Sequence, residues 1–139
     1  MMMLGVGAMG LMSILLDEKD NEYTHPHDYY VSGTYGPKSV TGTGNSVYIN
    51  ESEREYLYQF TTTVSGCDIP KFNVICDSSK KPTDLYERLG EVTVDDEQLT
   101  RYRYEFEGAT FTFDMDEKMV VHHYTVVSDG YSLEAKMVS

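Results

Sequence analysis

The sequence contains no tryptophan, only two cysteines and four prolines, and few positive charges. Lysines and arginines number 11 against 23 aspartates and glutamates, so the formal net charge at pH 7 is -12. Such a surface repels nucleic acids and the headgroups of anionic lipids. We therefore expect neither nucleic-acid binding nor peripheral membrane binding. The partners that remain are basic proteins, a basic glycan or cations.

The sequence motifs of common enzymes are missing as well. No G-x-S-x-G, H-E-x-x-H, Walker A or G-x-G-x-x-G pattern occurs in the chain. The segment Gly42-Thr43-Gly44 is too short to indicate a phosphate-binding loop. A cysteine activated by His122 or His123 is conceivable, but a nucleophile must lie within hydrogen-bonding distance of its base. The sequence therefore favours a protein that is not an enzyme and holds no cofactor, with catalysis as the alternative.

Aromatic residues are abundant, with 12 tyrosines and 5 phenylalanines among 139 residues. Aromatic rings pack well on the pleated surface of a β-sheet, so this composition favours strands over helices. A chain of this length forms one hydrophobic core, because two cores would each bury too little surface to be stable. We expect a single all-β domain.

Short segments of alternating polarity follow one another from Tyr29 onward, with turn residues between them. In one segment Tyr56, Tyr58 and Phe60 fall on one side of the predicted strand. Such alternation predicts antiparallel strands with one buried face. The expected strands are 29–35, 38–50, 55–65, 71–76, 91–94, 99–106, 110–115, 119–127 and 131–138.

These segments predict an antiparallel meander of about eight strands. A single open sheet would expose an apolar face and two edges, so we expect the meander to close into a barrel or to stack as a sandwich. Two segments of the C-terminal half carry the aromatic residues that we expect to be buried: Tyr102, Tyr104, Phe106, Phe111 and Phe113.

Two local features interrupt the strand pattern. Gly42 and Gly44 lie inside a predicted strand and indicate a β-bulge or a sharp bend. Residues 84–89 predict one short helix, because their acidic residues have the spacing of a capping box and Gly90 follows as a stop. No other helix is expected in the β-domain.

The first sixteen residues, Met1 to Leu16, are uncharged, and the polarity changes abruptly at Asp17. As a helix this segment would be about 24 Å long, short of the roughly 30 Å hydrocarbon core of a membrane. It also lacks the positive residues that begin a secretory signal. We expect a marginal membrane anchor or a signal-like segment at 1–16, with a buried core element as the alternative.

Residues 17–28 are polar and have no regular period, which predicts a linker. The linker joins the N-terminal segment to the β-domain at 29–139. This organisation predicts a protein that is secreted or held at the cell membrane, with the β-domain on the extracytoplasmic side. The N-terminal segment would be its only contact with the membrane.

Cys67 and Cys76 flank a predicted turn at Ile69-Pro70. A disulfide forms only if their Cα atoms come within about 6 Å of each other, and an oxidising compartment favours it. For so short a loop the bond would stabilise the fold by about 2 to 3 kcal/mol. We predict this disulfide, with two buried thiols as the alternative.

Histidines and carboxylates supply candidate metal ligands, because imidazole and carboxylate groups bind zinc, copper or calcium. Their spacing matches no established metal-binding motif, and the alternative is that they are ordinary linker, strand and turn residues. The candidates are His25, His27, His122, Asp114, Asp116 and Glu117.

Asn50 begins an N-x-S triplet at a predicted turn and is a candidate for N-linked glycosylation. Such triplets are common by chance, and this one counts only if the domain is exported. The alternative is an unmodified turn residue.

The combined features predict a membrane-tethered or exported β-domain that acts as a binding or assembly module for a protein or a glycan. One alternative is a β-barrel with an internal site, which would carry a small molecule or catalyse a reaction. Another is an acidic intracellular inhibitor of a basic partner.

Overall fold

The computed structural model describes residues 22–52 and 55–138, which form nine β-strands and a single turn of 3-10 helix. The predicted anchor at 1–16 lies outside the described residues. Within them, no helix has the length and apolar character needed to cross a membrane. The elements in chain order are η1 (Glu22–Thr24), β1 (His27–Tyr35), β2 (Lys38–Ser52), β3 (Glu55–Val64), β4 (Phe72–Asp77), β5 (Glu87–Val94), β6 (Glu97–Phe106), β7 (Ala109–Met115), β8 (Val121–Ser128) and β9 (Tyr131–Met137).

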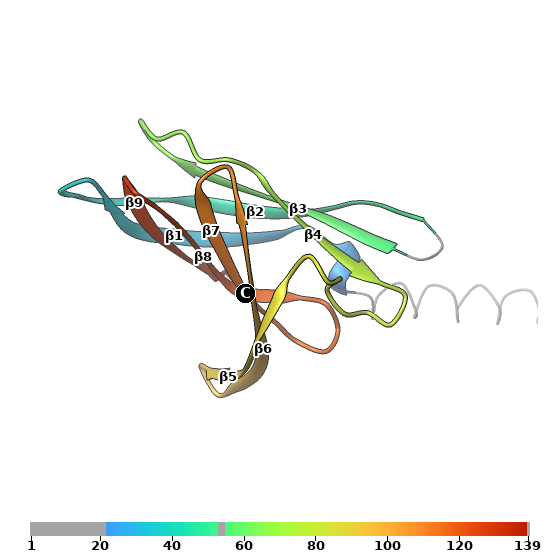
Figure 1. The fold of residues 1–139 in the computed structure, drawn as a ribbon. Coiled ribbons are helices and arrows are strands. Elements are labelled where there is room, and N and C mark those ends of the chain that lie inside the picture. The colour runs from blue at the N-terminus through green and yellow to red at the C-terminus, as the bar shows by residue number, and fades with distance from the viewer. Residues whose placement is uncertain (1–21, 53–54, 139) are drawn as a thin grey trace, which may run out of the picture.

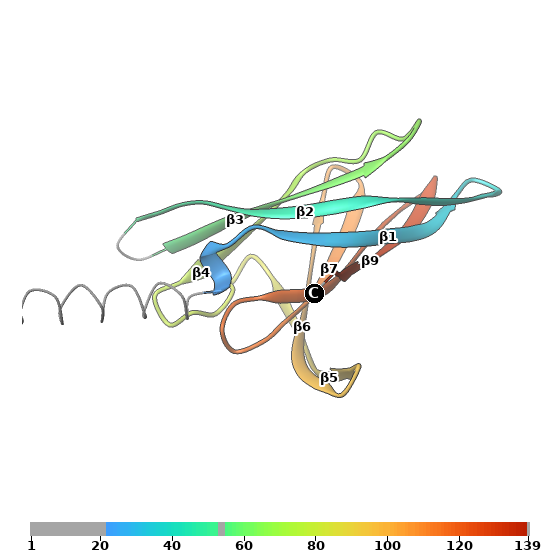
Figure 2. The same ribbon diagram turned by 180° about the vertical axis from the view of Figure 1, so that it is seen from behind.

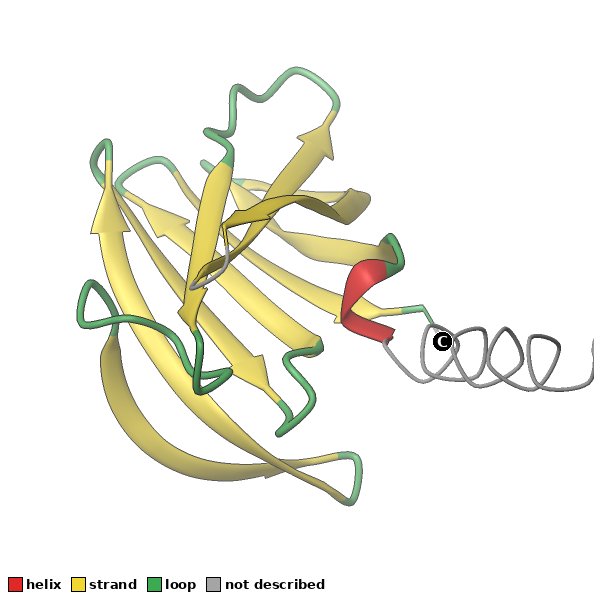
Figure 3. Ribbon diagram, turned by 90° about the vertical axis from the view of Figure 1, so that its right-hand side faces the viewer, coloured by secondary structure: helices red, strands yellow, loops and turns green. Residues whose placement is uncertain are grey.

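All nine strands belong to one antiparallel sheet, in the order β4-β3-β2-β1-β9-β8-β7-β6-β5 (Figure 1). Two meanders, β1 to β4 and β5 to β9, are joined because β1 pairs with β9. The sheet curves around its interior, as Figure 2 and Figure 3 show, but β4 and β5 do not pair and the sheet stays open. The antiparallel all-β fold is confirmed, whereas the expectation of a closed barrel or of two stacked sheets is wrong.

The sheet stays open because the chain itself occupies the outer edge of β4. After β4 the backbone folds back, so that the N–H of Asp77 donates to the carbonyl of Lys81 at 2.8 Å. The N–H of Thr83 then donates to the carbonyl of Ile75 at 3.0 Å. These bonds use the backbone groups that β5 would need to complete a barrel.

A tyrosine side chain covers the rest of this edge. The hydroxyl of Tyr104, on β6, accepts a hydrogen bond of 3.1 Å from the N–H of Asn73 and donates one of 2.9 Å to its carbonyl. An uncovered edge strand would invite pairing with another chain. The two ends of the curved sheet are therefore joined by side chains instead of by strand pairing.

The buried face is aromatic, as the alternation predicts. Tyr29, Phe60 and Tyr124 are at most 2% exposed, and Phe72 and Phe111 are fully buried. Phe72 of β4 stacks on Phe111 of β7 with ring centroids 4.6 Å apart. Since these strands are far apart in the sheet order, the contact shows that side chains fill the interior of the curve.

Among the residues predicted to be buried, one is an exception. Tyr102, Phe111 and Phe113 are buried and Tyr104 is partly buried, but Phe106 is 43% exposed. Phe106 is the last residue of β6, directly before the turn to β7. Its ring contacts Phe72 edge-on at a centroid distance of 6.0 Å, and the rest of it stays exposed at the end of the hairpin.

Two local predictions are wrong. Residues 84–89 form a turn followed by the start of β5, because Tyr86 points into the core and the backbone continues in an extended form. Gly42 and Gly44 do not form a bulge, since the register of β2 with β3 is regular from Gly42 to Tyr48. Gly44 instead leaves room for a ring, because a Cβ there would lie 2.3 Å from the hydroxyl of Tyr124.

Candidate binding pocket

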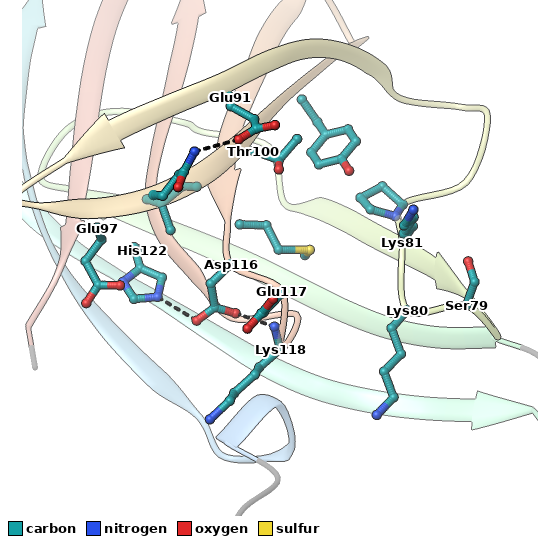
Figure 4. Close-up of a pocket in the computed structure, with 15 residues that line it drawn as sticks. Ser79, Lys80, Lys81, Glu91, Glu97, Thr100, Asp116, Glu117, Lys118 and His122 are labelled. Carbon is teal, nitrogen blue, oxygen red and sulfur yellow. Dashed lines mark hydrogen bonds and ion pairs between the residues drawn. The ribbon is translucent and has the colours of Figure 1, made fainter.

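A half-open pocket of about 750 Å³ lies at the gap in the sheet. The β4–β5 connection, the β5–β6 hairpin and the β7–β8 loop form its walls (Figure 4). Leu99, Tyr102 and Met115 contribute apolar surface. The size is within the range of pockets that hold small molecules. Its charged and titratable lining residues are Lys80, Lys81, Glu91, Glu97, Asp116, Glu117, Lys118 and His122.

One wall is a tight loop that begins at the last residue of β4, Asp77. The loop is closed by the bond from Asp77 to the carbonyl of Lys81, and the N–H of Lys80 donates to the carbonyl of Asp77 at 2.9 Å. Oδ1 of Asp77 accepts the N–H groups of Ser79 at 2.9 Å and of Lys81 at 3.4 Å, and also the hydroxyl of Ser79. The aspartate side chain thus fixes the backbone of the two lysines.

A second wall, from Asp116 to Val120, is built in the same way. The N–H of Asp116 donates to the carbonyl of Val120 at 2.9 Å, and the N–H of Met119 donates to the carbonyl of Asp116 at 3.2 Å. Oδ1 of Asp116 accepts the N–H groups of Lys118 at 2.8 Å and of Val120 at 3.0 Å. Each bond has its counterpart in the other loop.

We call residues 77–81 the first Asp loop and residues 116–120 the second Asp loop. In both, the fourth residue is left-handed, with φ of 66° at Lys80 and 68° at Met119. This conformation completes a three-residue connection between antiparallel segments. An aspartate suits the first position because its carboxylate bonds the N–H two residues later. The side chains that the two loops carry therefore stand on defined backbones at the pocket.

His122 is brought to the pocket by an irregularity of the sheet. The register of β7 and β8 shifts next to Asp114, which leaves His122 as an extra residue before the pair of Asp114 with His123. A bulge of this kind redirects a side chain. The Nε2 atom of His122 lies 2.8 Å from Oδ2 of Asp116. The second Asp loop and the bulge therefore present an imidazole and a carboxylate together.

Asp116 is a carboxylate at neutral pH. Burial raises its pKa, but the hydrogen bonds from His122 and from the N–H groups of Val120 and Lys118 lower it by more, so its pKa lies below the usual range. A histidine held by such a carboxylate can donate or accept a hydrogen bond.

The lysines and the arginines of this protein differ in whether they form ion pairs. No lysine forms an ion pair with a carboxylate whose side chain the structure describes, yet three of the six described lysines line this pocket. The three arginines that the structure describes, in contrast, each form an ion pair. Their pairs are Arg88 with Glu91 at 3.9 Å, Arg101 with Asp114 at 2.7 Å and Arg103 with Glu87 at 2.6 Å.

The opposite face of the sheet carries a separate polar network across four strands. Asp114 is fully buried and accepts Nε and Nη2 of Arg101 at 2.7 and 2.9 Å. Its Oδ2 also lies 3.1 Å from Nδ1 of His123, whose Nε2 lies 3.2 Å from Glu134. Within this network every charged group lies beside a group of opposite charge. We therefore assign the network a structural role.

The pKa values within the network follow from these contacts. Burial raises the pKa of Asp114, but Arg101 and His123 lower it by more, and it lies below its ordinary value. The hydrogen bond to Asp114 raises the pKa of His123 above its ordinary value, and Glu134 adds to this, while burial opposes it. The network therefore favours a charged His123.

The six candidate metal ligands of the sequence lie in three separate places. Across residues 22–52 and 55–138, no group of three or more His, Cys, Asp or Glu side chains is arranged to hold a metal ion. The places are the start of β1 for His25 and His27, the pocket for His122, Asp116 and Glu117, and the opposite face for Asp114.

The predicted disulfide is not formed, and both cysteines are free thiols. Cys76 is buried in β4, whereas Cys67 lies before β4, near the connection from β3. Cys76 pairs with Tyr56 in β3, whereas the N–H of Cys67 donates to the carbonyl of Val64 at the other end of the same strand. Tyr56 and Val64 are eight residue steps, or about 26 Å, apart along an extended strand, well beyond the Cα separation of a disulfide. Burial raises the pKa of the Cys76 thiol to about 12, and the charge of Asp77 contributes.

Asn50 has a position that the sequence did not predict, whereas Asp95 and Asp96 lie in the turn expected between the strands 91–94 and 99–106. β2 continues through Ser52, so Asn50 lies in a strand opposite Leu57 and not in a turn. Its glycosylation stays a prediction. Asp95 and Asp96 form the two-residue turn between β5 and β6, with left-handed φ values of 51° and 69°.

Sequence reasoning missed the pocket lysines and Glu97. The available signal was an aspartate followed by turn-forming residues, D-S-S-K-K at 77–81 and D-E-K-M-V at 116–120. This signal predicts turns but does not show that the two turns meet at one pocket.

No protein-family model matches this chain, and no curated protein matches it at a significant level. Its function has to be inferred from its own residues.

Proposed function

We propose that this domain is a binding module that holds a small charged molecule in the pocket between the two Asp loops. The observation that supports this most directly is the collection of charged side chains at one half-enclosed pocket with hydrogen-bonded walls. Lys81, Lys118, Glu97 and Glu117 line it and form no ion pair with any other described side chain. All four side chains are exposed and can therefore be reached by a ligand from solvent.

An internal site has less support as the place of binding. The interior between β4 and β7 is occupied by the stacked rings of Phe72 and Phe111, with Tyr29, Phe60 and Tyr124 beside them. A carrier needs a cavity where these rings lie. The half-open pocket at the gap offers both space and polar groups.

In the proposed arrangement, residues 1–16 tether or export the module, an assignment supported by their apolar composition. The described chain begins beside the pocket. The ring of Tyr23 packs edge-on against Tyr56 at a centroid distance of 5.7 Å. The Nζ atom of Lys80, which lines the pocket, lies 5.9 Å from the Tyr23 ring.

A second candidate function is acid–base catalysis in the same pocket. It is favoured by the contact of 2.8 Å between His122 and Asp116, which would let His122 accept a proton from a bound molecule. The two functions differ in the fate of the ligand, since a binding module releases it chemically unchanged.

Binding is tested by adding small anions, amines and zwitterions separately to the isotope-labelled full chain and recording two-dimensional NMR spectra. We expect saturable shifts concentrated in the amides of the two Asp loops. Replacement of Lys81 by alanine and of Glu117 by glutamine should weaken these shifts, while the matched variant Lys38→Ala, at the start of β2, should not. Unchanged spectra with every compound, or shifts centred away from both loops, would refute the proposal.

A further inference from the structure

We infer that the ligand of this pocket is a zwitterion, with its anionic group at Lys80 and Lys81 and its cationic group at Glu97 and Glu117. The inference rests on the proposed function and adds the chemical class of the ligand. It follows from the position of two lysines of the first Asp loop across the pocket from two glutamates.

Lys80 and Lys81 belong to the first Asp loop, whereas Glu97 begins β6 and Glu117 belongs to the second Asp loop. Figure 4 shows the two lysines beside the β4–β5 connection, with Glu97, His122 and Asp116 across the pocket from them. The wall formed by the first Asp loop thus carries only positive charges, whereas the facing wall carries Glu97 and Glu117 together with Lys118 of the second Asp loop.

Internal contacts already engage some of these charges. Glu91 accepts a hydrogen bond of 2.7 Å from Gln98, and Asp116 is bonded to His122 and to its own loop. The charge of Lys81 acts on Asp77 and helps to hold the pKa of that carboxyl below its usual range, after the larger effect of the Ser79 hydroxyl.

The remaining groups have little internal compensation. Lys80 lies over the ring of Tyr23 at 5.9 Å, and neither Glu97 nor Glu117 forms an ion pair with a side chain in the described part of the chain. These glutamates stand on the wall that faces the lysines. Lys80 on one side of the pocket and Glu97 and Glu117 on the other therefore form no ion pair with a side chain that the structure describes.

A ligand with a single charge fits this pocket poorly. An anion at Lys80 and Lys81 would stand near the carboxylates of the facing wall, in a protein with a net charge of -12. A simple cation at Glu97 would meet the lysines. A molecule with both charges places each one beside its opposite, and such complementarity gives selectivity. The size of the pocket selects a small molecule over a macromolecule.

The matching probes are ω-amino acids of increasing length, from glycine through γ-aminobutyrate to ε-aminocaproate. Each is compared with the carboxylate and the amine that correspond to its two halves, by NMR titration of the full chain. We expect at least one ω-amino acid to bind roughly tenfold more tightly than both of its halves, the gain of one further favourable charge contact.

Paired substitutions assign each charge to its wall. Lys80→Gln with Lys81→Gln should weaken the ω-amino acid and the carboxylate roughly threefold to tenfold and leave the amine unchanged. Glu97→Gln with Glu117→Gln should weaken the ω-amino acid and the amine and leave the carboxylate unchanged. Lys38→Gln is the control for net charge, and all substituted side chains are at the surface, so folding is checked by the dispersion of the amide spectrum.

If a carboxylate or an amine binds the Asp loops as tightly as every corresponding ω-amino acid, the pocket binds ligands but the zwitterion inference is wrong. Failure of the whole ω-amino acid series to bind at millimolar concentration also overturns it. The proposed binding function fails separately, when none of the anions, amines and zwitterions shifts either loop.

Discussion

The hydroxyl of Tyr86 donates a hydrogen bond of 2.7 Å to the carbonyl oxygen of Asn73. The same hydroxyl accepts one of 3.0 Å from the N–H of Ile75, so a single side chain satisfies two backbone groups of an edge strand. The hydroxyl of Tyr104 accepts a hydrogen bond from the N–H of Asn73 and donates one to the same Asn73 carbonyl that Tyr86 binds. The open end of the sheet thus depends on two phenol groups.

Replacement of Tyr86 or of Tyr104 by phenylalanine should therefore destabilise the protein by about 1 to 2 kcal/mol. The ring stays in place, but backbone groups at the β4 edge lose their partner. Urea unfolding measures the loss, and amide hydrogen exchange should become faster at Ile75 for Tyr86→Phe and at Asn73 for Tyr104→Phe. Tyr30→Phe, at a tyrosine that is 55% exposed, is the control. Equal exchange in all three variants would contradict the covered edge.

Removal of the Asp114 charge should be more costly. Asp114→Asn leaves the Arg101 guanidinium and His123 without their carboxylate in a site where Asp114 is fully buried. Since Arg101 is 35% exposed and keeps some hydration, we expect a loss of about 2 to 3 kcal/mol. Asp129→Asn, at an exposed turn, is the matched control. The structural role of the network is wrong if the two variants unfold at the same urea concentration.

His123 should make stability depend on pH. It faces Asp114 on β7 and Glu134 and Lys136 on β9, and Arg101 binds the far side of Asp114. Its folded-state pKa is raised above the ordinary value of 6.5, so folding favours protonated His123. The resulting stabilisation is complete below pH 6.5 and declines as the pH rises through the raised folded-state pKa.

Unfolding free energies of the wild type and of His123→Gln, measured at several pH values, test this dependence. The difference between the two proteins should be largest on the acidic side of pH 6.5, while Asp114 is still ionised. It should shrink at higher pH. A difference that is constant across this range would show that protonation of His123 does not contribute.

Gly44→Ala should disturb the core. The new Cβ would lie 2.3 Å from the hydroxyl of Tyr124, which forms a hydrogen bond of 2.8 Å with Thr62 on the neighbouring strand. Displacing this ring costs about 2 to 3 kcal/mol through strain and the lost bond. Gly130→Ala, where a Cβ meets nothing within 4 Å, should change the urea midpoint little. Similar midpoints for both variants would contradict the close packing at Gly44.

The two cysteines should differ in reactivity. Cys67 is partly exposed, whereas Cys76 is buried with a pKa raised to about 12, which suppresses the reactive thiolate. A thiol reagent added to the native, unreduced protein should therefore modify Cys67 alone, as peptide mass spectrometry would show. Both cysteines should react after denaturation. If neither reacts in denatured, unreduced protein, the thiols are not free.

The strand positions could be read from the sequence because they depend on a local property. Alternation with a period of two, as in Tyr56, Tyr58 and Phe60, assigns a face to each residue without knowledge of its neighbours in space. All nine expected strands occur, although the start of β5 was missed because an acidic turn resembles a helix start. The left-handed turn at Asp95-Asp96 also follows from local preference.

The candidate site could not be read in this way. Cys67 and Cys76 are close in sequence but distant along a hairpin, while the loops that begin at Asp77 and Asp116 are distant in sequence and line one pocket. The assignment of His122 to that pocket depends on a register shift between β7 and β8. Pairing and register are properties of two segments together, and composition of either segment does not determine them.

By itself the sequence determined an acidic antiparallel β-domain with an aromatic inner face, because side-chain alternation and turn residues act over a few positions. Only the tertiary structure decided that the sheet remains open and that a charged pocket occupies the gap. The physical reason is competition for the edge of β4: the backbone of Lys81 and Thr83 and the hydroxyls of Tyr86 and Tyr104 take the hydrogen bonds that would otherwise pair β4 with β5.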